Sequence, residues 1–155
     1  QMCIKVGKYL HFDNQKLSEI ELLGRLHDIG KLLLDNAILE KEGKLTKPEL
    51  GVIREHSEVG YRIANSIAEL SHISNYILYH HEKWDGTGYP NQLSGLKIPL
   101  QSRILSIADS IDAMKSHRPY SRPLSDDEVL AELKKYNGTQ FDPNLIPVFI
   151  ELFFE

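Results

Sequence analysis

The sequence predicts an all-α protein. Apolar residues recur mainly at helical intervals, and no run shows the sustained alternation of a strand bounded by hairpin turns. Three capping-box patterns, Ser18 with Glu21, Thr46 with Glu49 and Ser125 with Glu128, mark the beginnings of helices. The chain has 155 residues, of which 41% are hydrophobic, and this is enough to bury one core. We therefore expect a single helical domain over residues 1–155.

The first half of the chain is expected to hold three helices. The first spans about residues 18–34, with Ser18 as its N-cap and a buried face formed by Ile20, Leu23, Leu26 and Leu33. A loop over residues 35–47 follows. The second helix begins after Thr46 with Pro48 in its first turn and continues to about residue 67. The third is expected over about residues 71–82.

The second half opens with a stretch that cannot be helical. Residues 83–99 contain Gly86, Gly88, Pro90 and Gly95, which predict a structured surface loop. A helix then runs to about residue 116. Two prolines make residues 118–123 extended or turned, and a helix capped by Ser125 ends near Gly138. The last helix starts at residues 142–143, and because residues 145–154 are apolar on nearly every side, we expect it to be buried.

Composition excludes several classes of protein. The formal net charge is −4 and the isoelectric point is about 6.0, so the chain has no basic excess with which to coat a nucleic acid. The single cysteine, Cys3, excludes an intrachain disulfide and a thiolate-rich metal site, and it suits a reducing compartment. No apolar run approaches the roughly 20 residues that span a bilayer, and no signal peptide is evident. We expect a cytoplasmic protein.

Four histidines and two aspartates stand where helical geometry turns them toward one interior point. Burying such groups without compensation costs several kcal/mol each, and metal coordination is the usual remedy. A hydrogen-bonded core histidine explains one such residue alone, but adjacent His-Asp and His-His pairs on separate helices favour a metal centre. The three other histidines, His11, His72 and His117, have no such partners and are expected to be solvated or structural. The predicted set consists of His27, Asp28, His56, His80, His81 and Asp109.

Two ordered motifs resemble those of a known family. Residues 27–31, His-Asp-Ile-Gly-Lys, resemble the HD signature, and residues 80–90 resemble the HHE-x-x-DG-x-GYP signature. Together they resemble the HD-GYP family of cyclic di-GMP phosphodiesterases. The similarity continues through Arg103, Asp109, Asp112, residues 118–120 and residues 141–143, so it covers nearly the whole chain after residue 20.

The resemblance implies a bundle of helices with a glycine-rich GYP surface loop and two or three bound divalent metal ions. The six residues above are then the ligands, and Asp28 bridges two ions. Imidazole and carboxylate ligands without thiolate suit iron or manganese, with zinc and nickel as further candidates, and the resemblance favours iron first and manganese next. The implied activity is hydrolysis of cyclic di-GMP to pGpG and onward to GMP by a metal-activated water.

The resemblance also implies how the substrate is held. Lys31 lies one turn beyond His27 and is expected to reach a phosphate oxygen, although a surface lysine is the alternative. Arg118 matches the family's phosphate-binding arginine. Tyr89 is expected either to contact the substrate at the mouth of the site or simply to pack the loop. In that family the loop is also implicated in docking to GGDEF domains, Trp84 is expected to form a contact surface of the same loop, and a sensor or receiver domain is expected outside this chain.

Two departures from the family pattern leave alternatives open. The family places a further histidine ligand about 30 residues before the HD pair, which lies upstream of Gln1, so we expect a domain truncated at its N-terminus. Ser121 stands where the family is often basic, and Arg122 is expected to compensate. One alternative is therefore a catalytically weak cyclic-dinucleotide-binding module. The other is a phosphohydrolase acting on a different nucleotide, which the glycine loop and Arg118 argue against.

Overall fold

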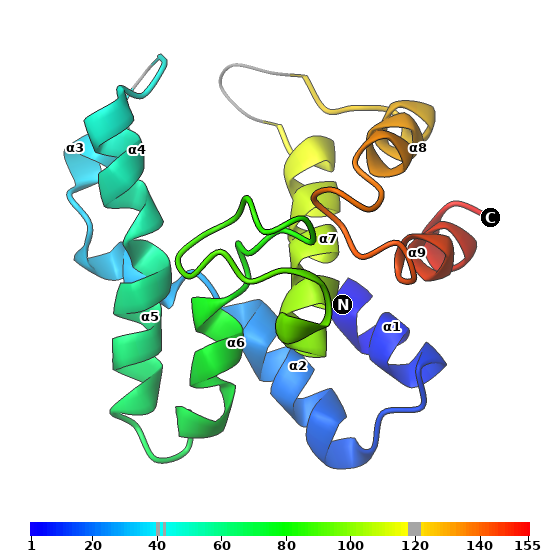
Figure 1. Cartoon of the computed structure of the whole chain (residues 1–155), viewed down its shortest axis with the longest axis horizontal. Helices are drawn as coiled ribbons and strands as arrows, with labels where there is room; N and C mark the ends of the chain where they lie inside the picture. The colour runs from blue at the N-terminus through cyan, green and yellow to red at the C-terminus, as the bar shows by residue number, and fades with distance from the viewer. Residues whose placement is uncertain (40, 42, 118–121) are drawn as a thin grey trace.

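A computed structural model describes residues 1–39, 41, 43–117 and 122–155. The described residues form helices and no strands, which confirms the all-α prediction (Figure 1). Short 3₁₀ helices occupy Ile29–Leu33, Ser71–Ile73 and Gly95–Lys97. The α-helices are α1 (Met2–Tyr9), α2 (Asn14–Leu26), α3 (Asn36–Leu39), α4 (Lys47–Arg54), α5 (His56–Asn65), α6 (Ser74–Leu78), α7 (Leu100–Lys115), α8 (Asp126–Lys135) and α9 (Ile146–Phe153).

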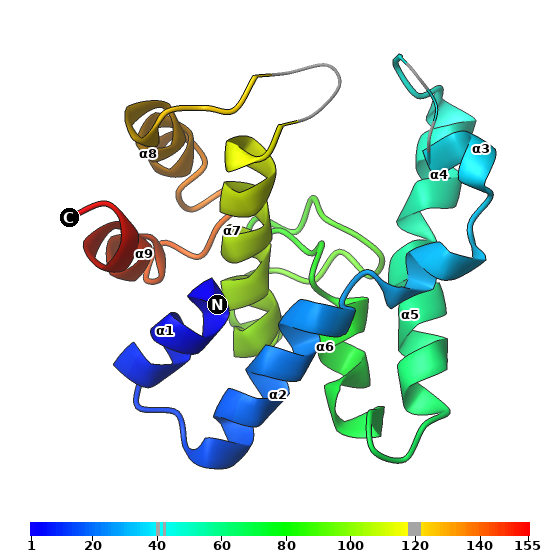
Figure 2. The ribbon, with the colours of Figure 1, turned by 180° about the vertical axis from the view of Figure 1, so that it is seen from behind.

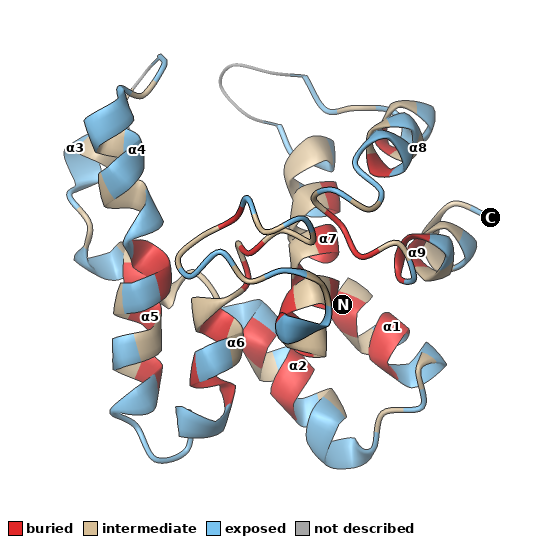
Figure 3. Cartoon of the chain, in the orientation of Figure 1, coloured by how far each residue is buried: buried red, intermediate tan, exposed pale blue. Residues whose placement is uncertain are grey.

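Helix α7 is the central element. Figures 1 and 2 show α4, α5 and α6 to one side of it, with α1, α8 and α9 to the other and α2 beneath. Its buried residues Ile104, Ile107 and Ile111 belong to a core that also includes Ile20 of α2 and Phe149 of α9. Figure 3 shows buried residues along α7 and on parts of the neighbouring helices, with further buried residues on α5. No helix in the described ranges is long and apolar enough to cross a membrane.

Two of the three predicted capping boxes are confirmed, but the box of Ser18 and Glu21 and both ends of the first predicted helix were wrong. Thr46 and Ser125 each accept a hydrogen bond from the backbone N–H three residues on. Helix α2 starts at Asn14 instead, because Asp13 is its N-cap and accepts from the Lys16 N–H at 2.8 Å. It ends at Leu26, where the chain tightens into the 3₁₀ helix Ile29–Leu33.

Other limits also differ from prediction. The segment expected as one helix to about residue 67 is divided into α4 and α5 at Glu55. Helix α6 ends at Leu78, so His80 and His81 lie beyond it rather than on it. In α9, Ile146 and Phe149 are buried while the remaining residues are half-buried or exposed, so the expected burial holds for one side only. Residues 118–121 lie outside the described ranges.

Candidate metal centre

The predicted set of six side chains is brought together from separate parts of the fold. His27 is the C-cap of α2 and Asp28 follows it at the entry to the 3₁₀ helix. His56 is the first residue of α5, and Asp109 lies in α7. The remaining pair, His80 and His81, follows α6 where the chain turns into the glycine-rich loop. Four ends or turns of helices and one helix interior therefore meet at one place.

His56 is the centre of one group of ligand atoms. Its Nε2 lies 3.5 Å from Asp28 Oδ1, 3.4 Å from His80 Nε2 and 3.2 Å from His81 Nε2. Ligand atoms of these four residues all lie within 4.8 Å of one another. His56 and His80 are each only 1% exposed. A single cation placed among the four atoms could be reached by all of them.

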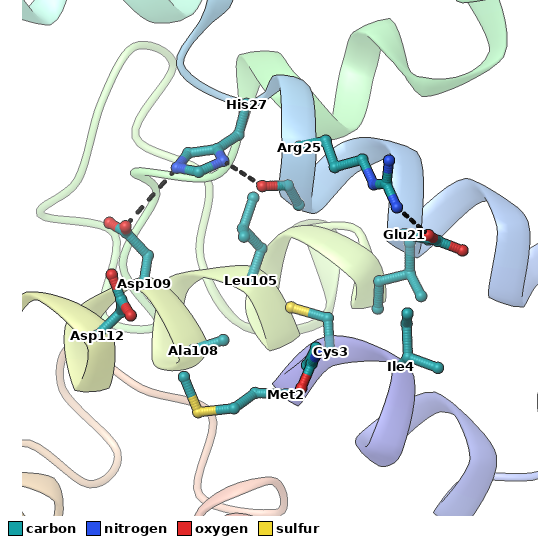
Figure 4. Close-up of a pocket in the computed structure, with 13 residues that line it drawn as sticks. Met2, Cys3, Ile4, Glu21, Arg25, His27, Leu105, Ala108, Asp109 and Asp112 are labelled. Carbon is teal, nitrogen blue, oxygen red and sulfur yellow. Dashed lines mark hydrogen bonds and ion pairs between the residues drawn. The ribbon is translucent and has the colours of Figure 1, made fainter.

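Asp28 connects this group to a second one. Its Oδ1 faces His56, while its Oδ2 lies 3.6 Å from His27 Nε2. That same His27 nitrogen is 3.6 Å from Asp109 Oδ1, and Figure 4 shows the His27 ring directed at Asp109. The two oxygens of one carboxylate thus face two different imidazoles. This is the arrangement that a carboxylate bridging two cations requires.

The hydrogen bonds of the imidazoles test whether a cation fits. His56 Nδ1 lies 2.6 Å from the Ile53 carbonyl oxygen and His80 Nδ1 lies 2.6 Å from that of Ile77. A carbonyl only accepts, so each Nδ1 donates and each neutral ring presents its Nε2 lone pair to the cluster. The His56 and His80 lone pairs, which face one another at 3.4 Å, repel unless a cation lies between them. A backbone carbonyl behind a ligating histidine is also the usual support of a metal site, so the residues fit a divalent metal.

Burial keeps most of this cluster in the form that binds metal. It lowers the pKa of His80 well below its ordinary value, lowers that of His81 to about 3, and lowers that of His56. Burial also opposes protonation of His27, but its contact with Asp109 and the nearby carboxylates raise its pKa overall. The same contact lowers the pKa of Asp109. Three neutral imidazoles and two carboxylates suit a divalent cation.

We expect the protein, once a chelator has removed its metal, to lose about 2 kcal/mol of unfolding free energy when the pH falls from 7.5 to 5.5. His56, His80 and His81 have folded-state pKa values below the unfolded value of 6.5, so the unfolded chain takes up more protons below that pH. Their stabilising effect is present above pH 6.5 and is lost as the pH falls, while the raised pKa of His27 opposes the trend in part.

Urea denaturation in EDTA at several pH values measures this loss, and the His80→Gln variant should show a shallower pH dependence. An unfolding free energy that stays constant over this range would contradict the buried neutral state of these imidazoles.

Two cationic side chains border the cluster. Lys31 Nζ lies 2.6 Å from Asp28 Oδ2, so it is held at the edge of the site on a half-exposed side chain. The Arg54 guanidinium lies 5.1 Å from the centroid of the Tyr89 ring, which in turn stacks on His81 with ring centroids 5.0 Å apart. Sequence analysis missed Arg54. The available signal was a basic residue two positions before His56 at the end of an amphipathic helix.

The glycine-rich loop is fixed by backbone contacts. The buried Glu82 carboxylate accepts hydrogen bonds from the Asn91 N–H at 2.7 Å and the Leu93 N–H at 3.1 Å. Gly86 has φ +82°, and a Cβ at Gly88 would lie 2.4 Å from the Lys83 nitrogen. These are the two uses of glycine expected for the loop: positive φ and close backbone approach. The loop therefore holds Tyr89 in place beside His81.

The remaining predicted residues lie farther from the cluster or outside the described ranges. Arg122 is exposed and its guanidinium donates to the Glu128 carboxylate, so its substrate contact stays a prediction. Arg118 lies outside the described residues. Trp84 is half-buried, with the Arg103 guanidinium 5.9 Å from its ring, so it is not a freely exposed surface residue. His11, His72 and His117 are exposed and none belongs to the cluster.

A cavity of about 350 Å³ opens beside His27 and Asp109 (Figure 4). Its walls come from α1, α2 and α7, and they include Cys3 and Asp112. Burial raises the pKa of the Cys3 thiol to about 11, so this cysteine is a protonated wall residue and not a thiolate ligand. Protein atoms therefore leave open space beside His27 and Asp109 of the cluster.

Comparison with known proteins agrees with this geometry. A family model described as an HD domain matches residues 1–145. A cyclic di-GMP phosphodiesterase of Thermotoga maritima is 39% identical over 140 residues, which cover 88% of this chain and 38% of the relative. A 3′3′-cGAMP-specific phosphodiesterase 2 of Vibrio cholerae is 41% identical over 128 residues, which cover 81% of this chain and 24% of the relative.

A solved structure shows the same fold. The crystal structure of a cyclic GMP-AMP-specific phosphodiesterase of V. cholerae matches 97% of this chain and 41% of its own with a TM-score of 0.72, at 20% identity. The chain spans about a quarter to two-fifths of the length of these proteins. It belongs to the HD-domain family, and the predicted resemblance to the HD-GYP branch of that family is confirmed.

Proposed function

We propose that this domain hydrolyses a phosphodiester bond of cyclic di-GMP, giving pGpG and then GMP. The observation that carries the proposal is the convergence of His56, His80 and His81 Nε2 atoms on Asp28, with the His27–Asp109 pair beside it. The Thermotoga relative, a cyclic di-GMP phosphodiesterase, supports the choice of substrate. We propose iron as the metal, with manganese next, in two or three sites.

The chain's own residues have separable tasks in this reaction. Bound divalent ions would activate water and neutralise phosphate oxygens. Asp28 would fix the spacing of the ions through its two oxygens. Lys31 would exchange its contact with Asp28 for one with a phosphate oxygen. Tyr89 has a pKa raised to about 12 by burial, so its phenol stays neutral and can border a substrate without adding charge.

The alternatives concern the substrate and the completeness of the metal centre. The Vibrio relatives specific for 3′3′-cGAMP favour a mixed cyclic dinucleotide as the alternative substrate. A catalytically weak binding module would follow if a further ligand, expected upstream of Gln1, is essential to the centre. Four further points stay predictions of the resemblance. They are the truncation, a GGDEF partner at the loop, a sensor or receiver domain outside residues 1–155, and a cytoplasmic location.

The direct test combines metal analysis with turnover. Protein purified without oxygen and loaded with iron or manganese is incubated with cyclic di-GMP and with 3′3′-cGAMP, and products are separated by chromatography. We expect bound metal and formation of pGpG. Metal binding without turnover of either compound, together with tight binding of cyclic di-GMP, would favour the binding module.

We expect Lys31→Ala to lower kcat/KM for cyclic di-GMP by about 30-fold, which corresponds to about 2 kcal/mol for a charge-assisted contact. The metal content should not change, because Lys31 is not a ligand. Steady-state kinetics with metal analysis separates these effects. A loss of metal in Lys31→Ala would show instead that Lys31 serves to orient Asp28.

A further inference from the structure

Another cavity lies at the junction of α4 and α5. Tyr89 lines this cavity and also contacts His81 of the metal cluster. It measures about 210 Å³ and is lined by Gly51, Arg54, Glu55, Glu58, Tyr89 and Pro90. Pockets for whole drug-sized ligands are larger, so a cavity of this size suits one part of a ligand. Tyr89 links the two places, because its ring stacks on His81 and also lies under Arg54.

The charged groups of this cavity are free to bind a ligand. Arg54, Glu55 and Glu58 are exposed, and none of them forms an ion pair with another residue in the described ranges. The guanidinium of Arg54 is instead held over the Tyr89 ring. An arginine placed on an aromatic ring is oriented in advance, so it loses less entropy when it binds a planar partner.

The mixture of charges selects among the parts of a cyclic dinucleotide. Two carboxylates repel a phosphate, so a second phosphate site is disfavoured here. Guanine instead offers O6 and N7 acceptors, which an arginine binds in bidentate fashion. It also offers N1–H and N2–H donors, which match a carboxylate because an ionised carboxylate only accepts.

Adenine has the opposite pattern. Its N6 amino group would face the Arg54 donors and its N1 acceptor would face a carboxylate, so both contacts become unfavourable. Tyr89 and Pro90 supply an apolar wall for either base. The charges therefore discriminate between the bases, while the wall does not.

We propose that the Arg54–Glu55–Glu58 cavity binds one guanine base of the substrate while a phosphodiester lies at the metal cluster. This inference rests on the proposed function and makes Arg54 a specificity-determining residue. The distance from the cavity to the metal cluster suits a single ligand that reaches both. The Arg54 guanidinium lies 5.1 Å from the centroid of the Tyr89 ring, and that centroid lies 5.0 Å from the centroid of the His81 ring.

The kinetic test uses the metal-loaded chain with cyclic di-GMP, 3′3′-cGAMP and bis(4-nitrophenyl) phosphate, which contains no base. We expect Arg54→Ala to raise KM for cyclic di-GMP by about tenfold or more and to leave hydrolysis of the base-free ester within about twofold of wild type. Arg62→Ala removes an exposed arginine of α5 that does not line this cavity, and it should match wild type. Equal KM values for Arg54→Ala and Arg62→Ala would overturn the proposal.

A third variant narrows the cavity without replacing any of its charged residues. Gly51 lies in α4, and a Cβ built there meets no other atom within 4 Å. Because Gly51 lines the cavity, leucine at this position is expected to favour the helix and to narrow the cavity. Gly51→Leu should therefore unfold no more readily than wild type and should still raise KM for cyclic di-GMP about tenfold or more. A stable Gly51→Leu protein with an unchanged KM would also overturn the proposal.

The choice of base is tested separately by the binding of GMP and AMP to the metal-loaded protein in calorimetry. We expect GMP to bind about tenfold more tightly than AMP, and the Glu55→Gln/Glu58→Gln double variant to reduce that preference at least about fivefold. Because this measurement does not need turnover, it decides the inference even if the chain hydrolyses no cyclic dinucleotide. Equal binding of GMP and AMP to wild type would reject a guanine site, whether or not cyclic di-GMP is hydrolysed.

Discussion

Replacing Asp28 with alanine is expected to reduce hydrolysis of cyclic di-GMP by at least about 1000-fold, or about 4 kcal/mol of transition-state stabilisation, while the domain stays folded. The Asp28 oxygens face His56 at 3.5 Å and His27 at 3.6 Å, so both groups of ligands depend on this one carboxylate. Its side chain is 40% exposed, and removing it therefore costs little packing. The loss should appear in activity and metal content rather than in helix content.

The measurement pairs turnover with circular dichroism and metal analysis of the same preparations. His72→Ala serves as the control, because His72 is an exposed histidine of the 3₁₀ helix Ser71–Ile73 and lies outside the cluster. It should retain full metal content and activity. Turnover by Asp28→Ala within about tenfold of wild type would reject the bridging role of Asp28.

The six clustered side chains could be anticipated from sequence because each belongs to a short motif or to a helical stripe. Burying a His-Asp and a His-His pair has few stable solutions, so their convergence follows from the pattern of apolar neighbours. The backbone carbonyls that orient these histidines could not be predicted from the sequence. His80 lies beyond the end of α6, and its Nδ1 contact with the Ile77 carbonyl depends on where that helix stops.

Helix ends were the weakest part of the prediction, for a local physical reason. Asp13 and Ser18 are both good N-caps, and the residue types alone do not distinguish them, whereas in the structure Asp13 is the cap. The division of α4 from α5 at Glu55 leaves no mark in the apolar periodicity, since the backbone of Glu55 stays in the helical region. Arg54, the last residue of α4, lies over Tyr89 of the glycine-rich loop, and the sequence does not show which distant segments meet.

Gly30→Ala is expected to destabilise the domain by at least about 3 kcal/mol and to abolish metal binding. A Cβ at Gly30 would lie 1.9 Å from the His56 carbonyl oxygen and 2.6 Å from the Gly60 nitrogen. Both are backbone atoms of α5, so no side chain can rotate away to make room. The 3₁₀ helix Ile29–Leu33 would have to separate from α5, and this would pull Asp28 away from His56.

A second glycine serves as a control. It shows whether the loss of stability in Gly30→Ala comes from the lack of space at that position or from replacing any helical glycine with alanine. Gly24 lies within α2, and a Cβ built there meets nothing within 4 Å, so Gly24→Ala should be neutral or stabilising by up to about 1 kcal/mol. Urea denaturation of both variants, followed by metal analysis, compares them directly. If Gly30→Ala unfolds at the same urea concentration as Gly24→Ala and binds the same metal, the close approach of these two helices does not set the geometry of the centre. The expected divergence would instead show that the glycine of the HD motif is required because its backbone touches the helix that begins with His56.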